Sequence, residues 1–172
     1  MKRGDKKGQF YLIAAIIIIA VVVGFVTIFN YSARRDSVKI YDFGEELGIE
    51  SQNVLDYGTY NEGTVDMDVL LEDFIESYVD YAGEGKNLYF LFGDFDNIKI
   101  IAYQELEESV SVDGSEIGIM DGMGEEMHTP SADEKVVIEI DDVEYDFKLN
   151  EGENFYFVIS QEIEGEKYVV TN

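Results

Sequence analysis

FYLIAAIIIIAVVVGFVTIF, the stretch from Phe10 to Phe29, decides how this chain is organised. Its 20 residues carry no charge, and only Gly24 and Thr27 interrupt the apolar character. A helix of that length is about 30 Å long, which matches the hydrocarbon thickness of a bilayer. The stretch is apolar on every side, and a chain of 172 residues has no core large enough to surround such a helix. The sequence therefore predicts a transmembrane helix over residues 9–29.

The residues in front of this stretch predict its orientation. Residues 1–8 contain four bases and one acid, a net charge of +3. Basic residues tend to stay on the cytoplasmic side of a membrane, although Arg34, Arg35 and Lys39 behind the helix weaken that argument here. We expect residues 1–8 to form a basic cytoplasmic leader and the rest of the chain to lie outside the cell membrane.

An ordinary secretory signal does not fit this start of the chain. Such a signal has an apolar core of about 7–15 residues, followed by a cleavage site of small residues. The core here is longer, and Ser32-Ala33 offers only a weak site behind it. The sequence therefore predicts that the apolar helix is retained.

A more specific pattern stands directly before the helix, where Lys6-Lys7-Gly8-Gln9-Phe10 places a basic pair and a glycine ahead of the apolar run. This pattern resembles the class III signal peptides of archaeal type IV pilin-like proteins, and the resemblance covers about the first 30 residues. It implies that a prepilin peptidase-type enzyme cuts between Gly8 and Gln9 on the cytoplasmic side, with Lys7 ahead of the cut. It also implies that the helix is kept for self-assembly in a filament.

One residue departs from a related pattern, and one alternative stays open. Many bacterial pilins carry Glu at the fifth mature position, where this chain has Ile13. Archaeal relatives often lack that Glu, so the departure argues mainly against a bacterial pilin. The alternative is an uncleaved single-pass anchor in membrane lipid, whose external domain binds a ligand, a cation or a protein partner.

Composition excludes several other classes of function. The chain has 37 acidic and 12 basic residues, a net charge of -25, which makes nucleic acid an unsuitable partner. It has no Cys, so disulfides, thiolate nucleophiles and cysteine metal sites are excluded. A hydrophobic fraction of 46% is too high for a disordered acidic chain. We expect an acidic, folded α+β domain over residues 43–172, outside the cytoplasm.

Two or three helices are expected before the strands of that domain. Residues 30–42 are expected to extend the membrane helix outward, and Glu45–Tyr57 reads as a short helix that ends at Gly58. A clearer amphipathic helix begins after a cap at Thr64 or Asp66 and stops at the glycines that follow Ala82. Its apolar positions recur at intervals of three and four residues: Met67, Leu70, Leu71, Phe74, Ile75, Tyr78, Tyr81 and Ala82.

Alternating patterns predict antiparallel strands in the rest of the domain. The sequence favours a meander of hairpins with one face in water, which gives an α+β head. The stretch from Gly118 to Asp133 is expected to be a mobile loop. The predicted strands are 87–92, 98–103, 108–112, 116–120, 135–140, 143–149, 154–163 and 167–170.

Candidate chemical sites are few. The single His, His128, stands three residues from Ser131, which is poor grounds for a catalytic triad. Acidic turns at 94–97 and 141–144 could supply oxygen ligands to Ca²⁺, but they lack EF-hand spacing, and acidic residues also favour turns by themselves. Asn30-Tyr31-Ser32 is an N-glycosylation pattern close to the membrane, and we expect it to stay unused.

These patterns together favour a structural surface protein. We predict no catalytic residues, no cofactor and no metal site. We expect the protein to be anchored or assembled through its apolar helix, with the acidic head outside.

Overall fold

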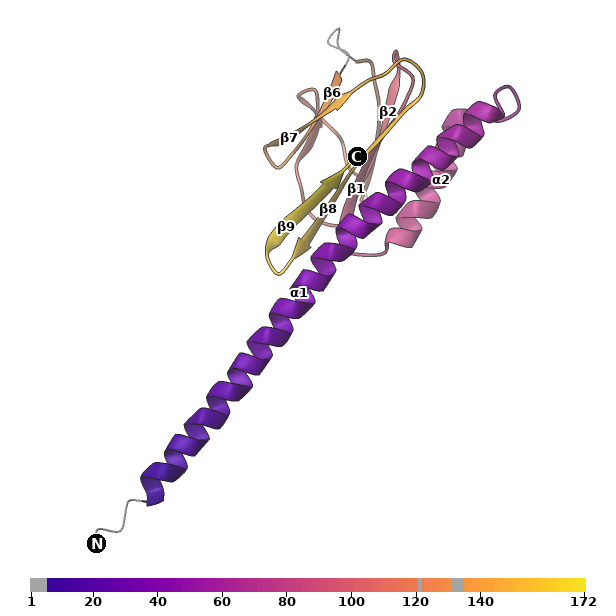
Figure 1. Ribbon diagram of the computed structural model, residues 1–172. Helices are drawn as coiled ribbons and strands as arrows, with labels where there is room; N and C mark the ends of the chain where they lie inside the picture. The colour runs from indigo at the N-terminus through magenta and orange to yellow at the C-terminus, as the bar shows by residue number, and fades with distance from the viewer. Residues whose placement is uncertain (1–5, 121, 131–134) are drawn as a thin grey trace. The chain divides into compact units, whose positions relative to one another are not determined.

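The computed structural model describes the backbone of residues 6–120, 122–130 and 135–172, and the side chains of these residues except those of 6–14 and 26–38. The chain divides into two compact units, Met1–Lys39 and Ile40–Asn172. The fold is α+β, as predicted. Helices α1 (Lys6–Tyr60) and α2 (Met67–Ala82) precede nine strands, and these form two antiparallel sheets in the described part of the chain (Figure 1).

The strands are divided between a five-stranded and a four-stranded sheet. The larger sheet has the order β5-β2-β1-β8-β9, and the smaller has the order β4-β3-β6-β7. The larger sheet contains β1 (Lys86–Gly93), β2 (Ile98–Tyr103), β5 (Met123–His128), β8 (Asn154–Ile163) and β9 (Glu166–Thr171). The smaller contains β3 (Val110–Val112), β4 (Ser115–Glu116), β6 (Lys135–Ile140) and β7 (Val143–Lys148).

Strand β1 lies at the centre of the larger sheet and is buried on both faces. Successive side chains of a strand point to opposite faces. Leu88, Phe90 and Phe92 belong to the core under the helices, whereas Tyr89 and Leu91 belong to the core between the two sheets. The Ile40–Asn172 unit therefore has three layers, with the five-stranded sheet between the helices and the four-stranded sheet.

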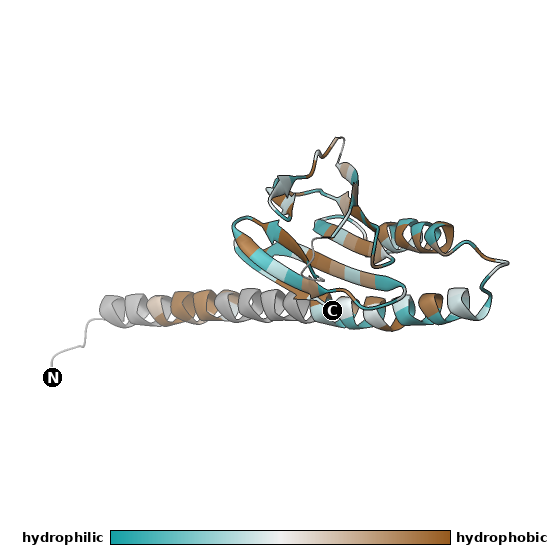
Figure 2. Cartoon of the chain, turned by 90° about the horizontal axis from the view of Figure 1, so that it is seen from above, coloured by the Kyte–Doolittle hydropathy of each residue, from teal (hydrophilic) through white to brown (hydrophobic). Residues whose placement is uncertain are grey.

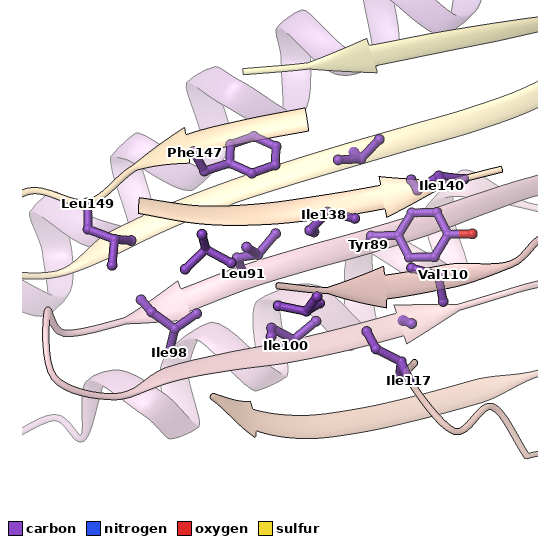
Figure 3. Packing of buried hydrophobic residues seen from close by; sticks show 14 residues of the cluster. Tyr89, Leu91, Ile98, Ile100, Val110, Ile117, Ile138, Ile140, Phe147 and Leu149 are labelled. Carbon is purple, nitrogen blue, oxygen red and sulfur yellow. The ribbon is translucent and has the colours of Figure 1, made fainter. Parts of the chain in front are cut away.

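The core between the sheets is mostly aliphatic. Branched side chains from β2 and β6 interleave with those of β1 and β3 (Figure 3). Two packed sheets lie about 10 Å apart, a space that Ile, Val and Leu fill well. The buried members of this core are Tyr89, Leu91, Ile98, Ile100, Ala102, Val110, Val112, Ile117, Val136, Ile138, Ile140, Phe147, Leu149 and Val158.

The core under the helices is rich in aromatic rings. Phe90, Phe155 and Phe157 from the sheet meet Tyr78 of α2, and Ile40 of α1 joins the same core. Helix α1 lies close to the five-stranded sheet at Gly44, where a Cβ atom would clash with the side chain of Val170. That glycine lets α1 approach β9.

Helix α1 corrects one prediction. The sequence predicts a separate helix over Glu45–Tyr57, whereas α1 continues without a break from Lys6 to Tyr60. Gly44, Gly48 and Gly58 all lie inside it, although glycine disfavours helix interiors. Gly44 and Gly58 face close neighbours, Val170 and Met67 respectively, so packing outweighs the local preference of these two residues.

Helix α2 confirms its prediction. The Asp66 side chain accepts hydrogen bonds from the backbone N–H groups of Asp68 and Val69, and Gly83 follows the last turn. Leu71, Ile75, Tyr78 and Ala82 are buried, as their spacing predicts.

Most predicted strands are present, but their arrangement differs from a meander. Strand β8 pairs with β1 and not with β7, and the five-stranded sheet is covered on both faces. Figure 2 shows the alternation of hydrophobic and hydrophilic residues along the strands. The segment predicted as a mobile loop contains β5, the edge strand that pairs with β2.

The Met1–Lys39 unit is helical from Lys6 onward. The side chains from Ile16 to Ile19, from Val21 to Val23 and of Phe25 are between 51% and 63% exposed. No helix meets the length and hydropathy needed to cross a membrane within the residues that could be searched, which are the described ones. The predicted span at 9–29 and its extension at 30–42 lie partly outside the described side chains.

Candidate functional site

The predicted processing site lies at the beginning of α1. Lys7, Gly8 and Gln9 belong to the helical backbone of its first turns, and their side chains lie outside the described residues. The described side chains offer three further features that could support binding or catalysis: a buried polar network, the single His, and an acidic cavity.

The polar network is centred on Glu108, which lies in the connection between β2 and β3. The Glu108 carboxylate accepts hydrogen bonds from Tyr89 Oη at 2.8 Å and from Ser160 Oγ at 2.5 Å. Gln104 donates to Tyr89 Oη at 2.9 Å and to the backbone oxygen of Glu108 at 3.1 Å. Tyr89 and Ser160 are fully buried, and the Glu108 side chain is 6% exposed. These hydroxyl groups are therefore closed to a substrate.

Two charges continue the network to the second sheet. Lys167 of β9 lies 3.0 Å from Glu108 and 2.8 Å from Asp141, which is in the turn between β6 and β7. Burial would raise the pKa of Glu108, but hydrogen bonds from Ser160, Tyr89 and Lys167 outweigh it and lower that pKa below its ordinary value. Burial would lower the pKa of Lys167, but its two acidic partners raise it. The hydrogen bond from Lys167 also lowers the pKa of Asp141. All three groups therefore stay charged at neutral pH, and the network ties the two sheets together.

Asn87 anchors the same connection from the other side. Its side-chain oxygen accepts hydrogen bonds from the backbone N–H groups of Glu105 and Leu106, at 2.7 and 2.8 Å. Its side-chain nitrogen donates to the backbone oxygen of Leu106 at 3.0 Å. A fully buried amide with these partners fixes the path of the chain as it crosses between the sheets. The arrangement is that of a structural cross-link.

His128 also joins the two sheets. Its Nε2 lies 2.8 Å from Oδ2 of Asp113, at the turn between β3 and β4, while His128 itself ends β5. The other oxygen of Asp113 accepts a hydrogen bond from the backbone of Val137 at 2.9 Å. Ser131, the residue considered as its partner in a triad, lies outside the described residues. The observed contacts join the edge strand β5 of the larger sheet to the β3–β4 turn and to β6 of the smaller sheet.

The carboxylates of Asp94 and Asp141, in the two acidic turns, are engaged in hydrogen bonds within the protein. Oδ1 of Asp94 accepts hydrogen bonds from the backbone of Asp96 at 2.9 Å and of Asn97 at 2.8 Å. Asp141 accepts from Ser109 and Lys167, and Asp142 has a φ of 63°, which turn geometry demands of it. No group of three or more His, Cys, Asp or Glu residues suited to hold a metal ion occurs among the described side chains.

An acidic cavity of about 500 Å³ lies where α1 ends and α2 begins. Leu55, Val65 and Met67 form its apolar wall, and Asp94 and Glu153 are among the acids on its rim. Burial and repulsion from Asp68 and Asp94 raise the pKa of Glu153 above its ordinary value. Asp68, Asp94 and Glu153 therefore concentrate negative charge at this corner of the head.

Sequence reasoning did not identify the Glu108 network. Glu108 is 59 positions before Lys167, and no local spacing connects two residues so far apart. The chain was also compared with protein-family models, curated proteins and solved structures, and none of them matches it.

Proposed function

We propose that this chain is a structural surface protein of the pilin-like type. Its apolar helix holds it in the cell membrane or packs with identical helices in a surface filament, and its acidic head lies outside. Its partners are membrane lipid, other copies of itself and a prepilin peptidase-type processing enzyme. This proposal rests on the arrangement of α1 and on the pattern around Gly8.

One observation carries the proposal. Eight Ile, Val and Phe side chains between Ile16 and Phe25 are more than half exposed, which is a continuous apolar surface. A stable soluble monomer rarely exposes a continuous apolar surface of this kind, so we expect lipid or other helices to cover it. Because β-branched side chains are stiff, this surface suits repeated close packing as well as lipid contact.

The described part of the head supports a passive mechanical role. Helix α1 contributes Ile40, Leu47 and Ser51 to the buried interior of the Ile40–Asn172 unit. The same helix carries the exposed apolar surface between Ile16 and Phe25. The sheets are cross-linked by Glu108, Lys167 and Asp141, which resists shearing of one sheet over the other.

Determination of the N-terminal residue tests the proposal. We expect the membrane-bound protein to begin at Gln9, after loss of the eight-residue leader. An intact Met1, or any other first residue, contradicts the pilin-like proposal. That result would leave the uncleaved single-pass protein with a binding head, for which the acidic cavity beside Met67 is the natural candidate site.

Two glycines of the leader provide a matched pair of variants. Gly8→Leu places a bulky side chain at the cut, so we expect the precursor to accumulate and filaments to be lost. Gly4→Leu makes the same change four residues earlier and should be processed normally. Intact mass of the membrane fraction and electron microscopy with an antibody to the head measure the two effects. If both variants behave like the natural chain, the proposal is wrong.

A further inference from the structure

Within the head, helix α1 contains one glycine that packing does not explain. A Cβ atom at Gly48 would meet nothing within 4 Å. The same atom would clash with a side chain of β9 at Gly44 and with Met67 at Gly58. Alanine favours the helical conformation about fivefold over glycine, so Gly48 weakens the helix at a position where a larger residue would fit. Gly48 is therefore a weak point of α1 that no close contact requires.

A serine one turn later adds to this weakness. Ser51 Oγ donates a hydrogen bond to the backbone oxygen of Gly48 at 3.0 Å. A serine that bonds back to the preceding turn often bends a helix, and pairs of glycine and serine are frequent sites of helix kinks. Hinges in proteins consist of a few such residues, so Gly48 and Ser51 together have the character of a hinge.

The two sides of Gly48 are anchored unequally. Ile40 and Leu47, which come before it, are both 0% exposed. Val54 and Leu55, which come after it, are only partly buried where they pack against the aromatic core. Because burial of apolar side chains holds a helix on a sheet, the part of α1 after Gly48 is held less firmly than the part before it.

The less firmly held part of α1 forms one wall of the acidic cavity. Leu55, Gly58 and Thr59 line the cavity from the helix. Asp94 and Glu153 line it from the turns that precede β2 and β8. The connection from α1 to α2 is mostly exposed, so it can follow a movement of the helix end. Such a movement would change the width of the cavity.

We propose that residues 49–60 form a flap, hinged at Gly48, that opens and closes the acidic cavity. This device lies wholly in the head, so it does not depend on cleavage at Gly8. Carboxylates line the cavity from both sides, Asp56 on the flap and Glu153 on the turn before β8. Their repulsion favours the open position, and dissolved salt, which screens the repulsion, favours the closed one.

Spin labels can measure the flap directly, because the chain has no Cys. Tyr57→Cys and Glu151→Cys place one label on the flap and one on the turn before β8, both at exposed positions. For the full-length chain in detergent micelles, pulsed electron paramagnetic resonance should show a shorter distance for the closed flap and a longer one for the open flap. Sodium chloride at 1 M, which shortens the screening length to about 3 Å, should lower the share of the longer distance.

A second pair of labels tests whether the movement begins at Gly48. Glu45→Cys takes the place of Tyr57→Cys, so that the label lies at an exposed position of α1 before the glycine. Together with Glu151→Cys it should give a single distance, because this part of the helix is anchored to the sheet. Two distances for this pair would mean that the whole helix moves, which overturns the hinge.

Two substitutions separate a hinge from unwinding of the helix end. Gly48→Ala should reduce the share of the longer distance about fivefold, because alanine disfavours the bent conformation. Asn53→Ala raises the helix propensity inside the flap and should leave both distances unchanged, because a flap that moves as a rigid piece stays helical. A single distance for the first pair of labels, a share that does not fall with salt, or equal effects of the two substitutions overturns the proposal.

Discussion

The two faces of the five-stranded sheet meet different neighbours and are built from different side chains. The face under the helices is aromatic, with Phe90, Phe92, Phe155 and Phe157 in its core. The face toward the smaller sheet is mainly aliphatic. Two packed sheets interleave their inward side chains in a layer about 10 Å thick, whereas each aromatic ring under the helices buries a large apolar area. The contrast teaches that one strand, β1, specifies both neighbours through its alternating residues.

The margins of the two cores differ as well. Beside the sheet–sheet core, Glu108, Lys167 and Asp141 compensate one another's charge. Beside the helix–sheet core, at the junction of α1 and α2, Glu153 is repelled by Asp68 and Asp94. Charge therefore stabilises one margin and destabilises the other, and two substitutions, Lys167→Met and Glu153→Gln, test this difference.

The largest effect is expected at Phe90, which is fully buried under the helices. Phe90→Ala should lower the free energy of unfolding by about 3–5 kcal/mol, through lost burial and a cavity. Leu91→Ala, on the opposite face of the same strand, should cost about 3 kcal/mol. Urea unfolding of the full-length chain in detergent measures both.

Two outcomes of this measurement would break the comparison. If Phe90→Ala costs less than Leu91→Ala, the helices pack more loosely than the second sheet. Tyr60→Ala removes an aromatic ring that is 90% exposed, and it should change the free energy by less than about 0.5 kcal/mol. A large effect there would mean that ring burial does not decide the cost.

A smaller effect is expected beside the sheet–sheet core, where Glu108, Lys167 and Asp141 compensate one another's charge. Lys167→Met leaves the buried Glu108 without its cation, though still hydrogen-bonded to Ser160 and Tyr89. We expect a loss of about 1–3 kcal/mol at pH 7. Lys135→Met disturbs an exposed pair with Asp146 and should cost less than about 0.5 kcal/mol.

The pH dependence of this loss has a definite sign. The pKa of Glu108 is lowered in the folded protein, so its stabilising contribution is present above the ordinary glutamate value of 4.5. It is lost as pH falls through the lowered pKa. The difference between the natural chain and Lys167→Met should therefore shrink below about pH 4.5. A difference that stays constant down to pH 2 would show that lost packing, and not charge, explains the cost.

The local part of this fold follows from the sequence. Helix α2 shows its cap at Asp66 and its buried stripe in the spacing of residues, and strands β2 and β6 have the predicted bounds, 98–103 and 135–140. These features depend on neighbours within a few positions, which periodicity records.

The non-local part does not follow from the sequence. The pairing of Leu88 with Ile159 joins residues 71 positions apart, and no local pattern selects β8 over β7 as the partner of β1. Strand β5 escaped prediction because Gly124 and the acids beside it are poor strand formers, and pairing with β2 stabilises them. The continuity of α1 through Gly44 likewise depends on the close approach to β9.

The smallest effect, and the only gain in stability, is expected at Glu153, beside the helix–sheet core. The raised pKa of Glu153 means that its charge opposes folding at neutral pH, so Glu153→Gln should raise the free energy of unfolding by about 0.5 kcal/mol or less. The sign is opposite to that for Glu108: the advantage of the variant should vanish as pH falls and Glu153 becomes protonated in the natural chain.

Salt separates repulsion from burial as the cause of this gain. Sodium chloride at 1 M shortens the screening length to about 3 Å, so it should remove the part of the gain that comes from Asp68 and Asp94. Glu151→Gln, in the same turn, is the control and should leave the unfolding free energy unchanged. If Glu153→Gln destabilises the head, the acidic corner is held by a contact of this carboxylate, and the two margins do not differ in sign.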